Sequence, residues 1–292
     1  MTHTPSPQQS EQLFDALARQ GLQLPAEHRR TITDRLERIR GYEPLVGVFG
    51  KTGAGKSSLC NAVFGRDICP ISDVGACTRT VQEVALNVGQ KGMKLLDVPG
   101  VGESDRRDAE YDALYRDWLP RLDLVLWVIK ADDRALASDE DFYKRLVKPY
   151  LEAGKPFFIV LNQVDKVEPF REWDEQARQP GPRQAANIED KRRSVAGFFG
   201  LPLNQVLAVS ANERYGLVEL VDRVIHELPA EKRVSVLREV QEEYRSQAAR
   251  EQARSGVAET LGTVIDALPL PAPVKFVAKA IVRVFDWIGS WF

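Results

Sequence analysis

The sequence predicts an α/β fold: a doubly wound, mainly parallel six-stranded sheet with helices before and after it. Two observations lead to this prediction. Apolar, strand-like runs alternate with helix-like segments over residues 41–228, and glycine-rich or polar loops follow several of the strands. Strands that alternate with helices form right-handed crossovers and a parallel sheet covered on both faces. Such a sheet binds ligands at the carboxyl ends of its strands.

The individual elements follow from the apolar runs and the breakers between them. Gly89-Gln90-Lys91-Gly92 predicts a turn that joins the only antiparallel pair of strands. The stretch from Glu168 to Ala186 contains three prolines and predicts a long loop, either a plain surface loop or a lid that contacts a partner. Strands are expected near 45–49, 81–88, 93–98, 122–130, 157–162 and 206–209, and helices near 57–64, 107–118, 138–152, 187–199 and 216–228.

The chain divides into four regions by composition and periodicity. Residues 1–10 are polar and predict a disordered tail without the pattern of a signal peptide. Residues 11–40 carry two amphipathic helical patterns separated by Gly21 and Pro25. The central domain is expected at 41–228, and 229–292 is expected to be a C-terminal helical region.

Composition limits the classes of function. The net charge of -2 gives no support for a protein that binds nucleic acid over its whole surface. The hydrophobic fraction of 43% and charged fraction of 28% are typical of a soluble globular protein. The three cysteines have no zinc-like spacing, and reduced thiols are the simplest interpretation, which predicts the cytoplasm.

A phosphate-binding loop is the most informative motif. Residues 50–57 fit the pattern G-x-x-x-x-G-K-[ST] at every fixed position, between an apolar strand and a helix. Backbone N–H groups of such a loop turn inward around an anion, and the helix start adds further donors. We expect Lys56 to reach the β- and γ-phosphates and the Ser57 hydroxyl to ligate Mg²⁺. The nucleotide-binding candidates here are Gly50, Gly53, Ala54, Gly55, Lys56, Ser57 and Ser58.

A second motif follows the expected strand 93–98, in the form Asp-x-x-Gly. Asp97 has the residue type that holds Mg²⁺ through its water shell, and the Gly100 N–H is expected to meet a γ-phosphate. Both residues lie at the end of a strand, as the fold requires of a ligand-binding residue.

Two further motifs indicate which base the site selects. Asn162-Gln163-Val164-Asp165 ends a buried-type strand, and the Asp165 carboxylate suits guanine N1–H and its exocyclic amine, a pair of donors that adenine lacks. Asn162 is expected to tie this loop to the phosphate-binding loop. The backbone of Ser210-Ala211-Asn212, after another strand, suits the guanine O6.

Taken in chain order, these motifs resemble the translation-factor-related class of P-loop GTPases. Ala76-Cys77-Thr78-Arg79-Thr80-Val81 is similar to the switch I segment of the Era-like and MnmE-like bacterial GTPases. By position, Thr78 falls on the threonine that closes over Mg²⁺ and the γ-phosphate, and Thr80 is the alternative. The resemblance therefore assigns Ser57, Thr78 and Asp97 to Mg²⁺, and Lys56, Thr78 and Gly100 to catalysis.

Over roughly residues 40–228 the chain resembles most a little-characterised bacterial family, often prophage-associated, labelled as GTPases or 50S-ribosome-binding-type GTPases. A more distant similarity, in the Thr-Gly-Ala-Gly-Lys-Ser segment, is to immunity-related GTPases. The resemblance implies a molecular switch that binds GTP and GDP and hydrolyses GTP with Mg²⁺. It makes region 41–228 the GTP-binding domain.

Three departures qualify this expectation. Gln163 stands where the related families carry a lysine whose alkyl stem covers the guanine, which predicts weaker affinity with intact base choice. Val101 stands where Ras-type proteins have the glutamine that orients the attacking water, which predicts slow intrinsic turnover. Gly53 replaces the asparagine of potassium-activated relatives, so potassium dependence is not expected.

The C-terminal helix leaves two interpretations open. Lys275, Lys279 and Arg283 form a narrow basic stripe on an apolar helix, and Trp287 and Trp291 lie near its end. The helix either packs against the N-terminal helices or lies at a membrane surface through 274–292. Charges near its centre argue against a transmembrane span. One alternative to the simple switch is therefore a nucleotide-gated, self-associating or membrane-interacting protein that acts through this helix, with a location at the periphery of a membrane. Another, a ribosome-associated assembly factor, is implied by the label of the similar family alone, and the charge gives it no support.

Overall fold

The computed structural model describes residues 8–65, 94–97, 119–133, 140, 143–144, 148–152 and 154–284. The chain forms two compact units. Unit 1 is helical and combines both ends of the chain, from residues 1–43, 225–238 and 245–292. Unit 2 is the α/β unit, from residues 44–224 and 239–244. The segment 239–244 therefore belongs to the α/β unit although it follows the expected central domain, 41–228.

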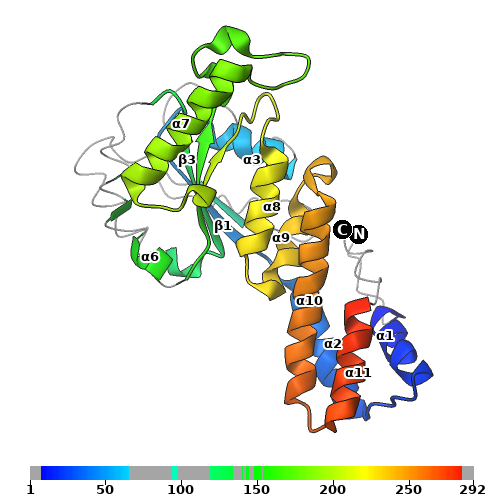
Figure 1. Ribbon diagram of the computed structural model, residues 1–292. Coiled ribbons are helices and arrows are strands. Elements are labelled where there is room, and N and C mark those ends of the chain that lie inside the picture. Colours follow the sequence, from blue (N-terminus) through cyan, green and yellow to red (C-terminus); the bar gives the residue numbers. More distant parts are fainter. Residues whose placement is uncertain are drawn as a thin grey trace. The chain divides into compact units, whose positions relative to one another are not determined.

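A parallel sheet forms the centre of unit 2 (Figure 1). Its five described strands lie in the order β2-β1-β3-β4-β5, and every described pairing is parallel. This confirms the α/β class with a parallel sheet. The sixth expected strand, 81–88, and its antiparallel pairing lie outside the described residues. The strands are β1 (Leu45–Phe49), β2 (Lys94–Asp97), β3 (Leu124–Lys130), β4 (Phe157–Asn162) and β5 (Val206–Ala208).

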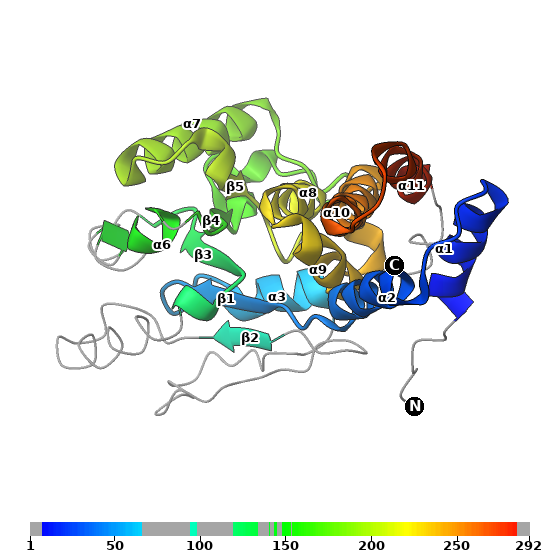
Figure 2. The ribbon, with the colours of Figure 1, turned by 90° about the horizontal axis from the view of Figure 1, so that it is seen from below.

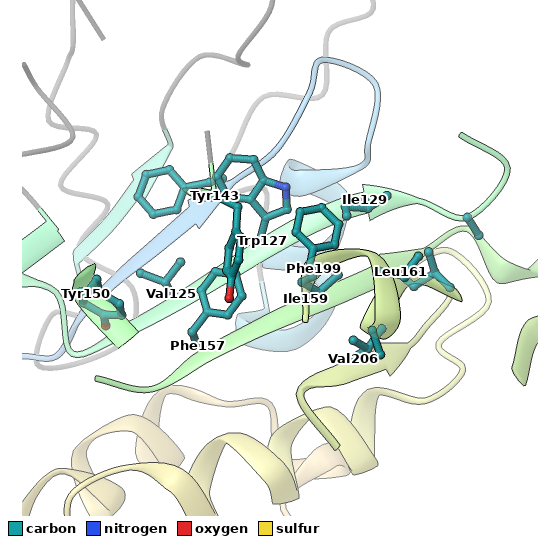
Figure 3. Packing of buried hydrophobic residues seen from close by; sticks show 14 of the residues in the cluster. Val125, Trp127, Ile129, Tyr143, Tyr150, Phe157, Ile159, Leu161, Phe199 and Val206 are labelled. Carbon is teal, nitrogen blue, oxygen red and sulfur yellow. The ribbon is translucent and has the colours of Figure 1, made fainter. Parts of the chain in front are cut away.

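Strands β3 and β4 are covered on both faces. All six residues of β4 are buried, as are the first six of β3, which explains why these strands are continuous apolar runs in the sequence. Figure 3 shows side chains from one face of the sheet clustered with Tyr143, Tyr150 and Phe199, which lie outside the strands. Tyr143 lies edge-on to Phe199 with ring centroids 5.3 Å apart, and it also meets Phe157. This aromatic packing fixes the sheet that positions the loops.

Helices cover the sheet of unit 2 on both sides (Figure 1). They are α3 (Lys56–Phe64), α6 (Lys148–Glu152), α7 (Pro182–Phe199) and α8 (Leu217–Glu227), of which α6 and α7 lie on one face and α3 and α8 on the other. The expected loop 168–186 is too long, because α7 begins at Pro182. Proline is favoured in the first helical turn, where its missing N–H has no intrahelical acceptor. The expected helix 107–118 lies outside the described residues.

The segment 239–244 closes the carboxyl end of α3. The Gln241 backbone N–H donates to the Val63 carbonyl at 2.8 Å, and its side-chain Nε2 donates to the carbonyls of Asn61, at 3.2 Å, and Ala62, at 2.5 Å. The last carbonyls of a helix lack intrahelical donors, so the bonds to Ala62 and Val63 satisfy groups that otherwise need water, while the Asn61 carbonyl also accepts from the Gly65 N–H at 3.0 Å. A residue distant in sequence thus caps the helix that begins at the phosphate-binding loop.

Unit 1 is built from long helices, which Figure 2 shows from below. Here α10 packs against both α2 and α11, and α1 packs against α11. Helix α1 begins at Gln8, inside the stretch expected to be a disordered tail. The helices are α1 (Gln8–Arg19), α2 (Ala26–Gly41), α9 (Arg233–Glu239, whose last residue belongs to unit 2), α10 (Gln247–Ala267) and α11 (Ala272–Val284).

Helix α11 buries two of its apolar residues and pairs two of its basic residues within unit 1. Ala278 and Val282 are buried. Lys279 Nζ lies 2.9 Å from both carboxylate oxygens of Asp266, and Lys275 Nζ donates to the Asp266 carbonyl at 2.6 Å. Trp287 and Trp291 lie outside the described residues. Among the helices described, none is long and apolar enough to cross a membrane.

Candidate nucleotide-binding site

The phosphate-binding loop joins the end of β1 to the start of α3. Gly50 has φ +136° and Gly55 has φ +87°, conformations that side chains disfavour. A Cβ on Gly50 would lie 2.1 Å from the Val128 carbonyl oxygen, and one on Gly55 would lie 2.3 Å from Asn162 Nδ2. Both positions therefore need glycine on two grounds, backbone conformation and space. A cavity of about 170 Å³ borders the loop at Lys51, Thr52, Gly53, Ala54, Val128, Ile129, Lys130 and Asp133.

Lys56 folds back over this loop. Its Nζ donates to the carbonyl of Gly50 at 2.8 Å and to that of Lys51 at 3.3 Å. Ser57 and Ser58 follow in the first turn of α3, half-buried. An ammonium group and the backbone N–H groups of a helix start are a combination that binds phosphate oxygens.

Asn162, at the end of β4, connects three loops. Its Nδ2 donates to the Ala54 carbonyl at 2.9 Å, with a longer contact of 3.4 Å to the Gly55 carbonyl. Its Oδ1 accepts a hydrogen bond from the Ala211 N–H at 3.1 Å. The side chain is 1% exposed. Asn162 therefore holds the phosphate-binding loop and the two loops after β4 and β5 in a fixed relation.

Gln163 makes a second connection to the phosphate-binding loop. Its backbone is left-handed, with φ 63°, and its Nε2 donates to the Gly53 carbonyl at 2.9 Å. Its Oε1 accepts from Lys166 Nζ, also at 2.9 Å. Both ends of the Gln163 amide are thus occupied within the protein. Nothing in the sequence pattern had singled out Lys166, because a lone lysine after the motif carries no periodic signal.

Asp165 lies on the short helical turn η3 (Val164–Lys166). Its Oδ1 is buried, and no residue of the described part of the chain bonds to it. A buried carboxylate oxygen without a donor is costly unless a ligand supplies one. The residue lines a cavity of about 730 Å³, together with Lys166, Phe170, Arg171, Trp173, Glu175 and Glu213. The cavity therefore borders the base-motif loop at Asp165 and the turn after β5 at Glu213, the residue that follows Ser210–Asn212.

The third loop, Ser210–Asn212, is a tight turn after β5. The Ser210 and Tyr215 backbones exchange two hydrogen bonds, at 3.1 and 3.0 Å, and Ser210 Oγ accepts from the Glu213 N–H at 3.2 Å. Ala211 is held by Asn162. The structure therefore brings this loop to Asn162, at the start of the base motif, although the two are distant in sequence.

The Mg²⁺ candidates are only partly described. Asp97 ends β2, and its register partner is Val48 in β1, so its backbone lies beside the strand that leads into the phosphate-binding loop. Thr78, Thr80 and Gly100 lie outside the described residues. Serine hydroxyl and aspartate carboxylate oxygens fit Mg²⁺, which takes one or two protein ligands and completes its shell with phosphate and water. The part of the chain that is described contains no group of three or more His, Cys, Asp or Glu residues that could hold a metal ion. Mg²⁺ bound by one or two protein ligands, phosphate and water does not need such a group.

Comparisons with known proteins identify the family. The family described as "50S ribosome-binding GTPase" matches residues 45–163. YkfA of Escherichia coli K12, an uncharacterized protein, is 44% identical over 88% of this chain and 89% of its own length. The chain belongs to the P-loop GTPase family. YfjP from the same organism, also uncharacterized, is 42% identical to this P-loop GTPase over 88% of the chain and 89% of YfjP.

Solved structures similar to this chain include that of Era in complex with MgGDPNP and nucleotides of 16S ribosomal RNA. Era is 20% identical to this P-loop GTPase, with a TM-score of 0.44, over 68% of this chain and 67% of Era. The sequence relatives also include GTPase Der from Leptospira borgpetersenii, 28% identical over 62% of this chain and 35% of Der.

Proposed function

We propose that this protein binds GTP and hydrolyses it to GDP and phosphate as a switch with slow intrinsic turnover. The observation that carries the proposal is the unpartnered, buried Oδ1 of Asp165, on a residue that borders a cavity between two loops. Asn162 fixes both loops to the phosphate-binding loop. A nucleotide would satisfy both features, because its phosphate chain would bind the phosphate-binding loop and its base would donate hydrogen bonds to Asp165.

Guanine supplies the donors that Asp165 lacks. Its N1–H and exocyclic amine would pair with the carboxylate, whereas adenine presents an acceptor at N1 and would leave the carboxylate unpaired. Sites built on such buried polar pairs reject the wrong partner strongly. We therefore assign base choice to Asp165, with the Ala211 and Asn212 backbone at the guanine O6.

Hydrolysis would proceed by in-line attack of water on the γ-phosphorus. The bond from that phosphorus to the β–γ bridging oxygen breaks as the new P–O bond forms, and the water proton passes to the released phosphate. Lys56 would stabilise the charge on the β- and γ-oxygens, and Thr78 and Gly100 would hold the γ-phosphate and the water. Mg²⁺, held by Ser57 and by Asp97 through water, would supply charge neutralisation.

Exchange of the base-reading carboxylate tests the assignment. Asp165→Asn should shift preference from GTP toward XTP, because an amide can donate to the second carbonyl of xanthine. Competition titration with GTP and XTP measures the change. Asp190→Asn, which alters an exposed aspartate on α7, is the control and should leave the preference unchanged. A variant at position 165 that keeps the wild-type preference for GTP would exclude Asp165 as the base-reading residue.

Slow turnover follows from Val101, which lacks the carboxamide that orients water. Single-turnover hydrolysis should run on the order of 10⁻² s⁻¹ or below, by analogy with related switches that are slow alone. The rate should rise with protein concentration if a second copy supplies the missing group. A rate above about 1 s⁻¹ that does not depend on concentration would instead mean a complete catalytic set in one chain.

The membrane alternative receives less support from α11. Two of its apolar residues, Ala278 and Val282, are buried, and Lys279 is paired with Asp266, although Phe276 is 74% exposed. We therefore favour a packing role for this helix over a membrane role. Liposome co-sedimentation with and without residues 270–292 tests this choice, and binding that depends on the segment would reverse it.

A further inference from the structure

The loop that follows the base motif, residues 167–181, has a defined conformation. The carboxylate of Glu172 accepts from the backbone N–H of Arg183 at 3.0 Å and of Gln184 at 3.3 Å, and from Arg183 Nε at 2.5 Å. The bond to Arg183 holds the pKa of the Glu172 carboxyl below its usual value. Asp174 Oδ1 accepts from two further backbone N–H groups, those of Gln176 and Ala177. The 167–181 loop is thus anchored to the start of α7.

Two contacts join the 167–181 loop and the start of α7 to the base-binding loops. Gln184 is 0% exposed, and its Nε2 donates to the carbonyls of Asp165, at 3.0 Å, and Val167, at 2.9 Å. Trp173 packs edge-on against Tyr215, with ring centroids 5.6 Å apart. The 167–181 loop therefore contacts the turn after β5, and the helix start holds the turn that bears Asp165.

The cavity beside Asp165 has an aromatic wall from this loop. Phe170 and Trp173 both line it, and Phe170 is 50% exposed. The indole Nε1 of Trp173, like Asp165 Oδ1, is buried without a hydrogen-bond partner in the described part of the chain. An exposed ring, an unpaired acceptor and an unpaired donor thus belong to residues around one cavity. This combination suits a flat ligand with polar edges.

Gln163 is poorly suited to cover such a ligand. Its stem has two methylenes where a lysine has four, and its amide is bound at both ends, to Gly53 and Lys166. Lys166 lines the cavity beside Asp165, whereas Gln163 is not among its lining residues. Phe170 lines the same cavity and offers it an exposed apolar ring.

We propose that Phe170 is a nucleobase-contacting residue whose ring, beside the stem of Lys166, covers a face of the guanine. The proposal rests on the GTP-binding function proposed above and adds a specific contact to it. The 167–181 loop is then part of the nucleotide site, and the affinity lost by the glutamine at position 163 is partly restored from a different segment.

Calorimetric titration with GDP and Mg²⁺ tests the contact. Phe170→Ala should raise the Kd about tenfold, since stacking of a base on an aromatic ring is worth this much in other proteins. Phe170→Tyr should stay within about twofold of the wild type, because the ring is kept, while Phe170→Leu should lose affinity although its volume is similar. Phe198→Ala removes a ring of comparable exposure, 42%, elsewhere in unit 2 and is the matched control.

The outcomes separate the two proposals. Wild-type protein that fails to bind GDP would overturn the proposed function itself, and this contact with it. Wild-type protein that binds GDP, with Phe170→Ala binding equally well, would overturn the contact alone. Full affinity in Phe170→Leu would also overturn it, because an apolar side chain without a ring would then suffice. Thermal melts of each variant, followed by circular dichroism, establish that the fold is kept.

Discussion

Loss of the Asn162 side chain should destabilise unit 2 even without nucleotide. Asn162→Ala removes the donor to the Ala54 carbonyl at 2.9 Å and the acceptor of the Ala211 N–H at 3.1 Å. Both partners are buried, with Ala54 at 3% and Ala211 at 6% exposure, so water reaches neither group readily. A buried polar group left unpaired costs about 1–3 kcal/mol, so the two together cost about 2–6 kcal/mol, and a cost of about 1.5 kcal/mol each gives about 3 kcal/mol.

Urea unfolding followed by circular dichroism measures this loss. With a typical dependence of about 2 kcal/mol per molar urea, the transition midpoint of unit 2 should fall by about 1.5 M. Asn204→Ala, at an exposed position of η5 (Leu203–Gln205), is the control and should change stability by less than about 0.5 kcal/mol. A midpoint shift in Asn162→Ala as small as that of the control would refute the view that Asn162 joins the three loops.

Two further predictions concern stability. Gln241→Ala removes two side-chain hydrogen bonds to the end of α3, those to the carbonyls of Asn61 and Ala62. The variant should lower the free energy of unfolding of unit 2 by about 1–2 kcal/mol, measured by urea unfolding. An unchanged midpoint would mean that water replaces the cap. Burial, with a smaller effect of Asp123, raises the pKa of the Tyr150 phenol well above its ordinary value. The folded state therefore holds this proton more tightly than the unfolded state, so its stabilisation is complete below about pH 10 and is lost as the pH rises further. Tyr150→Phe has no proton to lose and should show a smaller drop in melting temperature above about pH 10; an identical alkaline profile would contradict the assignment.

The strands that lead into motifs were predictable because two signals coincide there. Leu45–Phe49 and Phe157–Asn162 are apolar runs that end in a motif, and the structure places β1 and β4 at these same residues. The start of α7 was missed by five residues, because the prolines around residue 181 indicated a loop, whereas Pro182 in fact occupies the first helical turn.

The polar contacts that organise the site were not predictable in the same way. Gln184 is completely buried, yet a glutamine in a helix gives no sign in the sequence that its amide will hold the backbone of Asp165 and Val167. Lys166 and Phe170 lie outside every motif, and only the folded loop brings them to the cavity. Periodicity reports which face of an element is buried; it carries no information about which distant carbonyl a buried amide will meet.

The cap that Gln241 places on α3 also bears on how the protein is made. Asn61 and Gln241 are 180 residues apart in sequence. At about 5–20 residues per second, a ribosome needs roughly 10–35 s to synthesise that stretch. Throughout this interval the helix that carries Lys56 and Ser57 lacks its final partner. Unit 2 therefore reaches its complete set of contacts only after part of unit 1 has been translated, so the two units cannot mature strictly one after the other.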